Sequence, residues 1–204
     1  MIEFIPEVLF MVNKQRIIVS LICTAAIILS LASSSTAVAE LRYKRSTSTY
    51  DIPSVTLVTQ DGAKVNLKKY LASDKPVMVD FVFTTCTTIC PVLSACFSNI
   101  QRKLGPEAAN VRLVSISIDP DNDTPRKMKE YLSRYDVKPG WDFLTGSKDD
   151  IRKVTAAFNA IVDDKMSHLS LIFLWSPAEG KWIRLDGTIS TSELVDEYHK
   201  ALKN

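Results

Sequence analysis

Three apolar segments rich in β-branched residues constrain the fold more than any other feature of the sequence. They are PVMVDFVF at 76–83, VRLVSISI at 111–118 and LSLIFLW at 169–175. Nearly continuous apolar runs of this length are typical of strands whose two faces are both buried, as in sheets covered by helices. We therefore predict a central sheet flanked by helices.

Helical patterns and shorter strands fill the rest of the chain. Helices are expected over 86–104, after Asp123 or Thr124, after Ser147, and from Ser190 to about 202. Further strands are expected at 141–144, at 181–185 paired with 169–175, and in a hairpin over 54–58 and 64–67 with Asp-Gly at its turn. This alternation predicts an α/β sandwich with a mixed sheet and an added N-terminal hairpin.

The first 39 residues have the three parts of a secretory signal peptide. Lys14 and Arg16 form a basic region, an apolar run covers 17–31, and Ala37-Val38-Ala39 is a cleavage site of the A-x-A type. An uncleaved membrane anchor is the alternative, although the run is short for a span of ~20 residues. We predict a signal peptide or anchor at 1–39, a polar tether at 40–50 and one domain at 51–204. The expected location is the periplasm or the outer face of the inner membrane.

The net charge and the number of cysteines exclude one class of partner and one class of fold. The formal net charge is +2, and the sequence has no basic stripe with interleaved aromatic residues. Nucleic-acid binding is therefore not expected, and membrane contact is expected only through an uncleaved N-terminal segment. The three cysteines after residue 39 are Cys86, Cys90 and Cys96. An odd number, with two only four residues apart, is not the disulfide framework of a small secreted domain.

Cys86 and Cys90 lie where the strand at 76–83 is followed by a helix. The free N–H groups and partial positive charge of a helix N-terminus stabilise thiolate over thiol. At i and i+4 the two side chains share one helix face, and two thiolates with an open side suit Cu(I). A redox disulfide is the alternative, with Cys86 and Cys90 as a catalytic pair. It requires Cys86 to lie partly outside the helix, since helical i,i+4 Cβ atoms are ~5–6 Å apart.

Three other soft or titratable side chains, those of Cys96, His168 and His199, are further candidates for the site. Cys96 continues a helical apolar stripe, so we expect it in the core. His199 is expected at or near the surface of the last helix. His168 lies just before the strand at 169–175, where a loop residue can reach a neighbouring helix N-terminus. Position alone does not make it a ligand, because a lone histidine is more often structural or solvated.

Two segments of the chain resemble the Sco/SenC family. FVFTTCTTICP at 81–91 is similar to the family signature with its CxxxCP motif, and SISIDPDNDTP at 115–125 is similar to the second block, a strand followed by DPxxDTP. The spacing to His168 also matches, and the resemblance covers roughly residues 50–202. It implies a thioredoxin-like fold and copper bound by two cysteines and a histidine, here Cys86, Cys90 and His168.

The resemblance also implies a function. Family members deliver copper to, or maintain the thiols of, the dinuclear copper site of cytochrome c oxidase, and some act in redox signalling. It thus implies a metallochaperone that holds Cu(I), or Cu(II), with the copper subunit of cytochrome c oxidase or another exported copper or thiol client as partner. A thiol–disulfide oxidoreductase acting on exported cysteine pairs is the alternative. Structural zinc is disfavoured because it usually takes four ligands.

The sequence departs from the family pattern beside the histidine. Ser167 precedes His168 where an Asp is expected, and Met166 is either an auxiliary soft contact or an exposed loop residue. Two carboxylates complete the candidate set. Asp119 either tunes His168 or the thiols through hydrogen bonds around the ligands or opens a local turn, and Asp123 is expected to cap the next helix.

Overall fold

The computed structural model describes residues 43–161 and 164–203, so the predicted signal peptide or anchor at 1–39 lies outside the described residues. The strands are β1 (Tyr43–Ser48), β2 (Thr56–Thr59), β3 (Lys64–Asn66), β4 (Val77–Val82), β5 (Arg112–Ser117), β6 (Trp141–Thr145), β7 (Leu171–Ser176) and β8 (Lys181–Gly187). The helices are α2 (Leu67–Leu71), α3 (Ile89–Leu104), α4 (Pro125–Leu132), α5 (Lys148–Ala157) and α6 (Thr191–Ala201), with 3-10 turns η1 (Gly105–Asn110) and η2 (Lys165–Ser167). None of these helices is long and apolar enough to cross a membrane.

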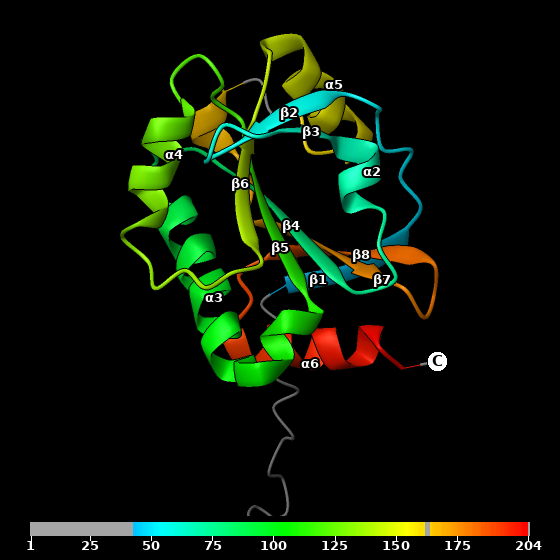
Figure 1. Ribbon diagram of the computed structural model, residues 1–204. Coiled ribbons are helices and arrows are strands. Elements are labelled where there is room, and N and C mark those ends of the chain that lie inside the picture. The colour runs from blue at the N-terminus through cyan, green and yellow to red at the C-terminus, as the bar shows by residue number, and fades with distance from the viewer. Residues whose placement is uncertain (1–42, 162–163, 204) are drawn as a thin grey trace, which may run out of the picture. The chain divides into compact units, whose positions relative to one another are not determined.

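The described strands form one sheet in the order β1-β8-β7-β4-β5-β6-β2-β3 (Figure 1). The central strands β4, β5 and β6 are parallel to one another. The other pairs, β4–β7 and β6–β2 among them, are antiparallel, so the sheet is mixed. This architecture confirms the predicted α/β sandwich.

β4 is the strand that the sequence pattern predicted to be buried on both faces, and all six of its residues are buried. Met78 and Val82 point into a cluster formed with α3, α4 and α6. Val77, Val79 and Phe81 point into a second cluster on the opposite face, formed with α2 and α5. β4 therefore lies between two apolar layers, and its C-terminal end leads directly to Cys86.

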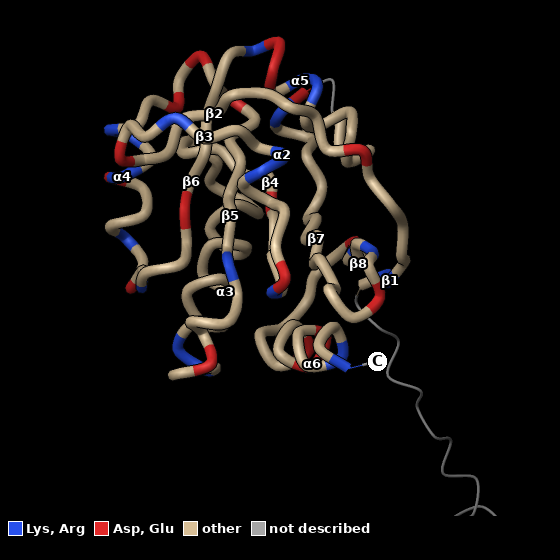
Figure 2. The backbone as a smooth tube through the Cα atoms, turned by 45° about the vertical axis from the view of Figure 1, so that its right-hand side comes forward, with Lys and Arg blue, Asp and Glu red and all other residues tan. Residues whose placement is uncertain are grey.

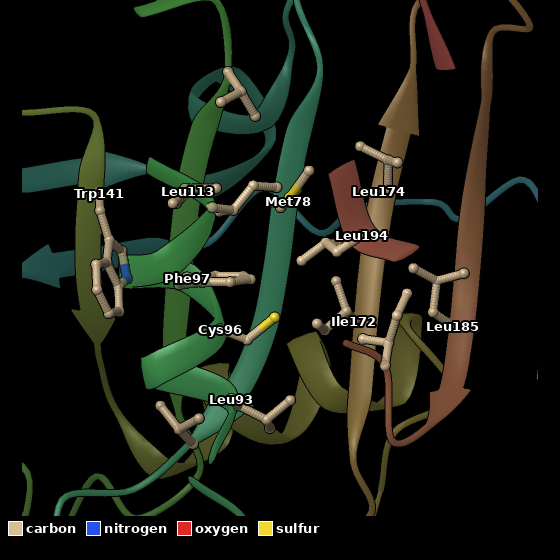
Figure 3. Packing of buried hydrophobic residues seen from close by; sticks show 14 of the residues in the cluster. Met78, Leu93, Cys96, Phe97, Leu113, Trp141, Ile172, Leu174, Leu185 and Leu194 are labelled. Atoms are coloured by element: carbon tan, nitrogen blue, oxygen red, sulfur yellow. The ribbon is translucent and has the colours of Figure 1, made fainter. Parts of the chain in front are cut away.

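The first of these clusters fixes α3 on the sheet. Met78 of β4, Phe97 of α3 and Leu194 of α6 lie close together, and Cys96 lies among them (Figure 3). Cys96 is 7% exposed, which confirms that it is a core residue. Burial of apolar side chains of this size contributes ~1.5–3 kcal/mol each, so the helix that carries Cys90 is firmly anchored.

Several local predictions are confirmed by the backbone geometry. The β2–β3 hairpin turns at Asp61-Gly62, where Gly62 has a φ of +83° that suits glycine. Ser190 and Glu193 form the expected capping box at the start of α6. These signals involve residues at most three or four apart, which is why they can be recognised in the sequence.

Residues 43–48 correct the predicted tether at 40–50. They form β1, which pairs with β8 along its whole length. The carboxylate of Glu197 in α6, which is 1% exposed, accepts hydrogen bonds from the Tyr43 hydroxyl at 3.2 Å and from Arg45 Nε at 2.8 Å. The sequence of this edge strand is polar because most of its side chains face water, and its partners lie more than a hundred residues away.

Charged residues lie mainly on helices and turns, and few occur in the central strands (Figure 2). Asp80 in β4 is an exception, because its side chain is fully buried. Neither of its carboxylate oxygens has a hydrogen-bond partner among the described residues. Burial raises the pKa of Asp80 to about 7.

Candidate metal centre

The connection between β4 and α3 carries Cys86 and Cys90. The helix begins at Ile89 and not at Cys86 as predicted, because residues 84–88 form turns in which the Cys86 N–H donates to the Phe83 carbonyl at 3.2 Å. Cys86 therefore precedes the helix, and Cys90 lies in its first turn. The i,i+4 helical spacing does not apply, and the turn brings the two thiols together instead.

Both cysteines are buried and unbonded to one another. Cys86 is 5% exposed and Cys90 is fully buried, and both are free thiols. Cys90 Sγ accepts the backbone N–H of Phe83 at 3.4 Å, and Cys86 Sγ lies 3.5 Å from the Thr88 hydroxyl. The same short turn thus supplies hydrogen bonds to each sulfur.

His168 reaches these sulfurs from the segment between η2 and β7. Its Nε2 lies 3.2 Å from Cys90 Sγ and 3.7 Å from Cys86 Sγ. The three possible ligand atoms lie within 4.8 Å of one another, and the described residues contain no second cluster of this kind. The fold therefore brings together the three residues named from the cysteine motif and the family resemblance.

The two thiols differ in acidity. Burial raises the pKa of both, but at Cys86 hydrogen bonds from the Thr88 hydroxyl, from His168 and from backbone N–H groups outweigh it and lower the pKa to about 6. At Cys90 burial dominates, and the charges of Cys86 and Asp80 raise the pKa further, while the Phe83 N–H offsets part of the rise. Cys86 is therefore the thiol that is ionised at neutral pH.

Asp123 has a different role from the one predicted. Thr124, not Asp123, caps α4, with its side chain accepting the Lys127 N–H. Asp123 is 1% exposed and accepts hydrogen bonds from the Thr84 N–H, the Thr84 hydroxyl at 2.5 Å and the Ser117 hydroxyl at 2.6 Å. It ties the start of the Cys86 turn to the end of β5. Its position beside a helix start suggested a cap, and no local signal in the sequence distinguishes the two roles.

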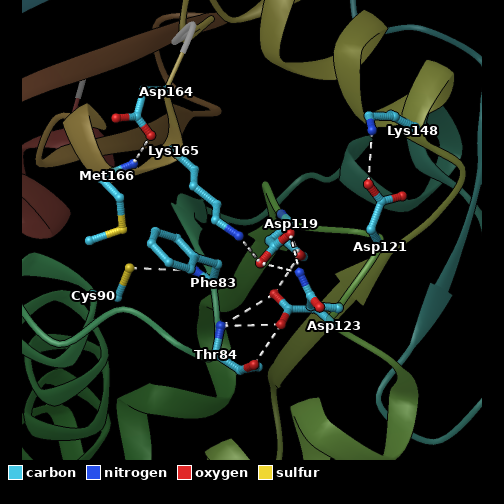
Figure 4. A network of polar contacts seen from close by, with 12 residues as sticks. Phe83, Thr84, Cys90, Asp119, Asp121, Asp123, Lys148, Asp164, Lys165 and Met166 are labelled. Carbon is cyan, nitrogen blue, oxygen red and sulfur yellow. Dashed lines mark hydrogen bonds and ion pairs between the residues drawn. The ribbon is translucent and has the colours of Figure 1, made fainter.

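Asp119 does not contact the candidate ligands. Its carboxylate accepts hydrogen bonds from Asn122 Nδ2 at 3.0 Å and from Lys165 Nζ at 2.5 Å (Figure 4). Asp119 forms no hydrogen bond with His168 or the thiols among the described residues, so it can affect them only through other residues. It opens the local turn of the alternative prediction, where its carbonyl accepts the N–H groups of Asn122 and Asp123.

Met166 and His199, the two other candidate contacts named from the sequence, have exposed side chains. Met166 is 56% exposed, in agreement with the interpretation as a loop residue. His199 Nε2 lies 3.3 Å from the Glu107 carboxylate, with a side chain that is 45% exposed. Neither belongs to the cluster of Cys86, Cys90 and His168.

The donor set fits a soft metal ion of low coordination number. Thiolate and imidazole groups are preferred by Cu(I) and Zn²⁺ over hard cations. Sulfur at ~2.3 Å and nitrogen at ~2.0 Å from one ion lie about 3.5–3.8 Å apart, close to the 3.2 and 3.7 Å found here between Nε2 and the two sulfurs. Three donors are fewer than structural zinc usually takes, and they suit Cu(I).

Sequence comparison places the chain among known proteins. The model of the SCO1/SenC family matches residues 45–203. The SCO1 protein homolog of Bacillus subtilis is 36% identical over 143 residues, which cover 66% of this chain and 72% of the relative. A SCO2-like protein of Rickettsia typhi is 31% identical over 153 residues, which cover 69% of this chain and 72% of the relative.

Solved structures agree with these relatives. ScoI of Bradyrhizobium japonicum with copper bound is 28% identical, with a TM-score of 0.63 over 76% of this chain and 100% of that one. BsSco, a member of the Sco family of cytochrome c oxidase assembly proteins in which a disulfide switch was identified, is 31% identical, with a TM-score of 0.64 over 76% of this chain and 95% of that one. The thioredoxin-like fold is thereby confirmed. This chain belongs to the SCO1/SenC family.

Proposed function

We propose that this protein is a copper metallochaperone that binds Cu(I) through Cys86, Cys90 and His168. The observation that carries the proposal is the convergence of two thiols and one imidazole nitrogen within 4.8 Å. Cu(I) is the expected state because two soft thiolates favour it over Cu(II). The copper-bound structure of a relative from Bradyrhizobium japonicum supports the choice of metal.

Copper is the cargo of this site, and the chain's own residues hold it for transfer. A three-coordinate ion leaves room for a ligand from a partner to add before one of the three leaves. His168 is the ligand best placed to leave first, because it comes from a separate segment, whereas Cys86 and Cys90 share one turn. The site therefore consists of two thiols held in one turn and an imidazole that can move away from them.

The partner that we propose is the copper subunit of cytochrome c oxidase or another exported copper or thiol protein. BsSco is described as a member of a family of cytochrome c oxidase assembly proteins, which supports this class of client. Thr87, Val92 and Leu169 are each one or two residues from a ligand in the sequence, and all three are exposed and uncharged. A partner surface with few charges fits these three residues.

We further propose that the protein works in the periplasm or at the outer face of the inner membrane. The basic, apolar and A-x-A parts of residues 14–39 support export. An exported dithiol meets an oxidising environment, and bound copper keeps both sulfurs from forming a disulfide. Cell fractionation with N-terminal sequencing of the mature protein tests this location and distinguishes cleavage from anchoring.

Anaerobic Cu(I) titration of the reduced protein, with bicinchoninate as competitor, tests the ligand set. Cys86→Ser and Cys90→Ser are expected to abolish stoichiometric binding. His168→Ala removes a ligand, so it is expected to weaken binding by more than the ~10-fold that loss of a group supporting a ligand costs. Cys96→Ser and His199→Ala are matched controls, because both residues lie outside the cluster. Unchanged affinity in His168→Ala would contradict the proposed site.

A thiol–disulfide oxidoreductase is the second candidate, and the acidity of the two cysteines favours it. A cysteine ionised at neutral pH beside a buried, protonated one is the arrangement in which one thiolate attacks and the other resolves the mixed disulfide. The disulfide switch identified in BsSco also supports it. Reduction of a model disulfide such as oxidised glutathione by the dithiol form measures this activity. Retention of that activity in His168→Ala, with loss of copper affinity, separates the two functions.

A further inference from the structure

His168 lacks the support that metal-binding histidines usually have. A ligating imidazole ordinarily donates its second ring nitrogen to a carboxylate, a carbonyl or water, which fixes the orientation of the ring. Here Nδ1 is buried and has no hydrogen-bond partner among the described residues. The ring packs edge-on against Phe83, with the ring centroids 5.4 Å apart. The orientation of His168 must therefore come from its ring packing and from the segment that carries it.

That segment is attached to the rest of the protein by Lys165. The Lys165 ammonium lies 2.5 Å from the Asp119 carboxylate and 5.5 Å from the centre of the Phe83 ring (Figure 4). The turn of η2 is closed by the His168 N–H, which donates to the Lys165 carbonyl at 3.3 Å. Lys165 and His168 are therefore linked through one short turn, so a shift of one moves the other.

Asp119 offers a rigid point of attachment for Lys165. Its side chain is 8% exposed, and both of its oxygens accept hydrogen bonds from Asn122 at 3.0 Å. Its backbone N–H donates to the Ser117 hydroxyl, which in turn donates to Asp123. Asp123 also accepts hydrogen bonds from Thr84 at the start of the cysteine turn. One polar network therefore contacts both the turn that carries the cysteines and the segment that carries His168.

We propose that Lys165 is a positioning residue, whose ion pair with Asp119 holds the imidazole of His168 against the thiols of Cys86 and Cys90. The inference rests on the proposed copper function but concerns a residue that is not itself a ligand. Loss of the ion pair frees the η2 segment, and the site then retains only the two thiols of the cysteine turn. The contribution of His168 to copper binding thus depends on an ion pair that does not itself touch the ligands.

Lys165→Leu tests this role, because it removes the ammonium but keeps an apolar side chain beside Phe83. We expect Cu(I) affinity, measured against bicinchoninate, to fall by about tenfold, the lower end of the effect of groups that orient metal ligands. Lys165→Arg keeps a cation at this position and should restore most of the affinity. Lys148→Leu is the matched control, since Lys148 forms an ion pair with Asp121 at 2.8 Å in the same cleft but is not linked to His168.

A double-mutant comparison shows whether Lys165 acts through His168. In the His168→Ala background, Lys165→Leu should cause no further loss of Cu(I) affinity, because the imidazole it positions is absent. The metal-free protein supplies a second readout by NMR: the nuclear Overhauser effects between the His168 and Phe83 rings should weaken in Lys165→Leu. The signals of His199, the other histidine of the chain, serve as the internal reference.

The outcomes that overturn the proposal are distinct. Unchanged affinity and unchanged ring contacts in Lys165→Leu would show that the ion pair does not position His168. An equal tenfold loss in the His168→Ala background would place the effect elsewhere, such as on general stability. If His168→Ala alone leaves the affinity unchanged, the proposed ligand set fails, and the NMR comparison in the metal-free protein still decides the positioning role.

Discussion

Cys86 and Cys90 are close in sequence and in space, yet their thiols have opposite environments. Cys86 receives hydrogen bonds from Thr88, His168 and backbone N–H groups, which stabilise its thiolate. Cys90 lies deeper, where loss of water outweighs its single N–H bond from Phe83. A site with one ionised and one protonated thiol releases a proton when a metal ion binds both, because only thiolates are ligands.

The lowered pKa of Cys86 predicts selective alkylation of the reduced, metal-free protein. With a pKa of about 6, the rate with iodoacetamide should rise with pH and level off near about pH 7, whereas an ordinary thiol with a pKa of ~8.5 still gains above pH 8. Peptide mapping by mass spectrometry measures the rate at each cysteine. Thr88→Val removes one stabilising hydroxyl and should move the curve to higher pH. A rate at Cys86 that continues to rise above pH 8 would contradict this assignment.

Asp80 predicts an unusual dependence of stability on pH. Burial raises the pKa of its carboxyl to about 7 in the folded protein, against ~3.9 in an unfolded chain. Between these values the folded state binds more protons than the unfolded state, so the free energy of unfolding falls as pH rises, by at most ~1.4 kcal/mol per pH unit. The contribution of Asp80 to stability is therefore fully present below the unfolded pKa and is lost as pH rises through about 7.

Asp80→Asn tests that dependence, because an amide has nearly the shape of the carboxyl but does not titrate. In urea denaturation, the stability gain of Asp80→Asn over the parent protein should increase from pH 5 to pH 8. Asp123→Asn is not a suitable comparison, since Asp123 accepts three hydrogen-bond donors and Asp80 accepts none among the described residues. A gain that is independent of pH would show that Asp80 is ionised in the folded protein.

At the scale of elements, the junction between β4 and α3 depends on a contact with β5. Asp123 accepts the N–H and hydroxyl of Thr84 and the hydroxyl of Ser117. Asp123→Ala leaves these buried donors unpaired and should lower the free energy of unfolding by roughly 3 kcal/mol. Thr124→Ala, at the adjacent helix cap, should cost only ~1 kcal/mol. Urea unfolding of both variants measures the difference, and equal losses would assign Asp123 a merely local role.

The contrast between Asp123 and Thr124 shows how far the sequence could predict this structure. The capping box at Ser190 and the hairpin turn at Gly62 depend on near neighbours in sequence, so propensity and spacing predict them. The same signals allowed either Asp123 or Thr124 as the cap of α4, and the choice of Asp123 was wrong. The partners of Asp123 come from β4 and β5, and only the alignment of those strands brings them together. Long-range pairing of this kind leaves no local pattern.

The same limit explains which parts of the candidate site could be predicted. The spacing of Cys86 and Cys90 and the strand before them are enough to predict a functional thiol pair. The position of His168 in the sequence does not predict a ligand, and only the family resemblance connects it with the cysteines. The ion pair of Lys165 with Asp119 joins residues 46 positions apart and could not be inferred from either segment.

At the scale of the whole molecule, β1 forms one edge of the sheet and covers β8, next to the strands that follow His168. Without it β8 would be the edge, and the polar, charged sequence of β1 is better suited to an edge because charged side chains oppose pairing between chains. β7, which begins three residues after His168, lies between β8 and β4. The N-terminal strand therefore supports the half of the sheet that leads from the histidine.

The contact between Arg45 and α6 provides the test of that role. Arg45 pairs at 2.8 Å with Glu197, which is 1% exposed and also bound by Tyr43 and Lys200. Arg45→Ala leaves the carboxylate with two partners and should lower the free energy of unfolding by roughly 1–2 kcal/mol. Lys44→Ala is the control, since Lys44 is exposed on the same strand, and it should change stability by less than ~0.5 kcal/mol. Equal small effects of the two substitutions in urea denaturation would show that the ion pair of Arg45 with Glu197 does not stabilise the attachment of β1 to α6.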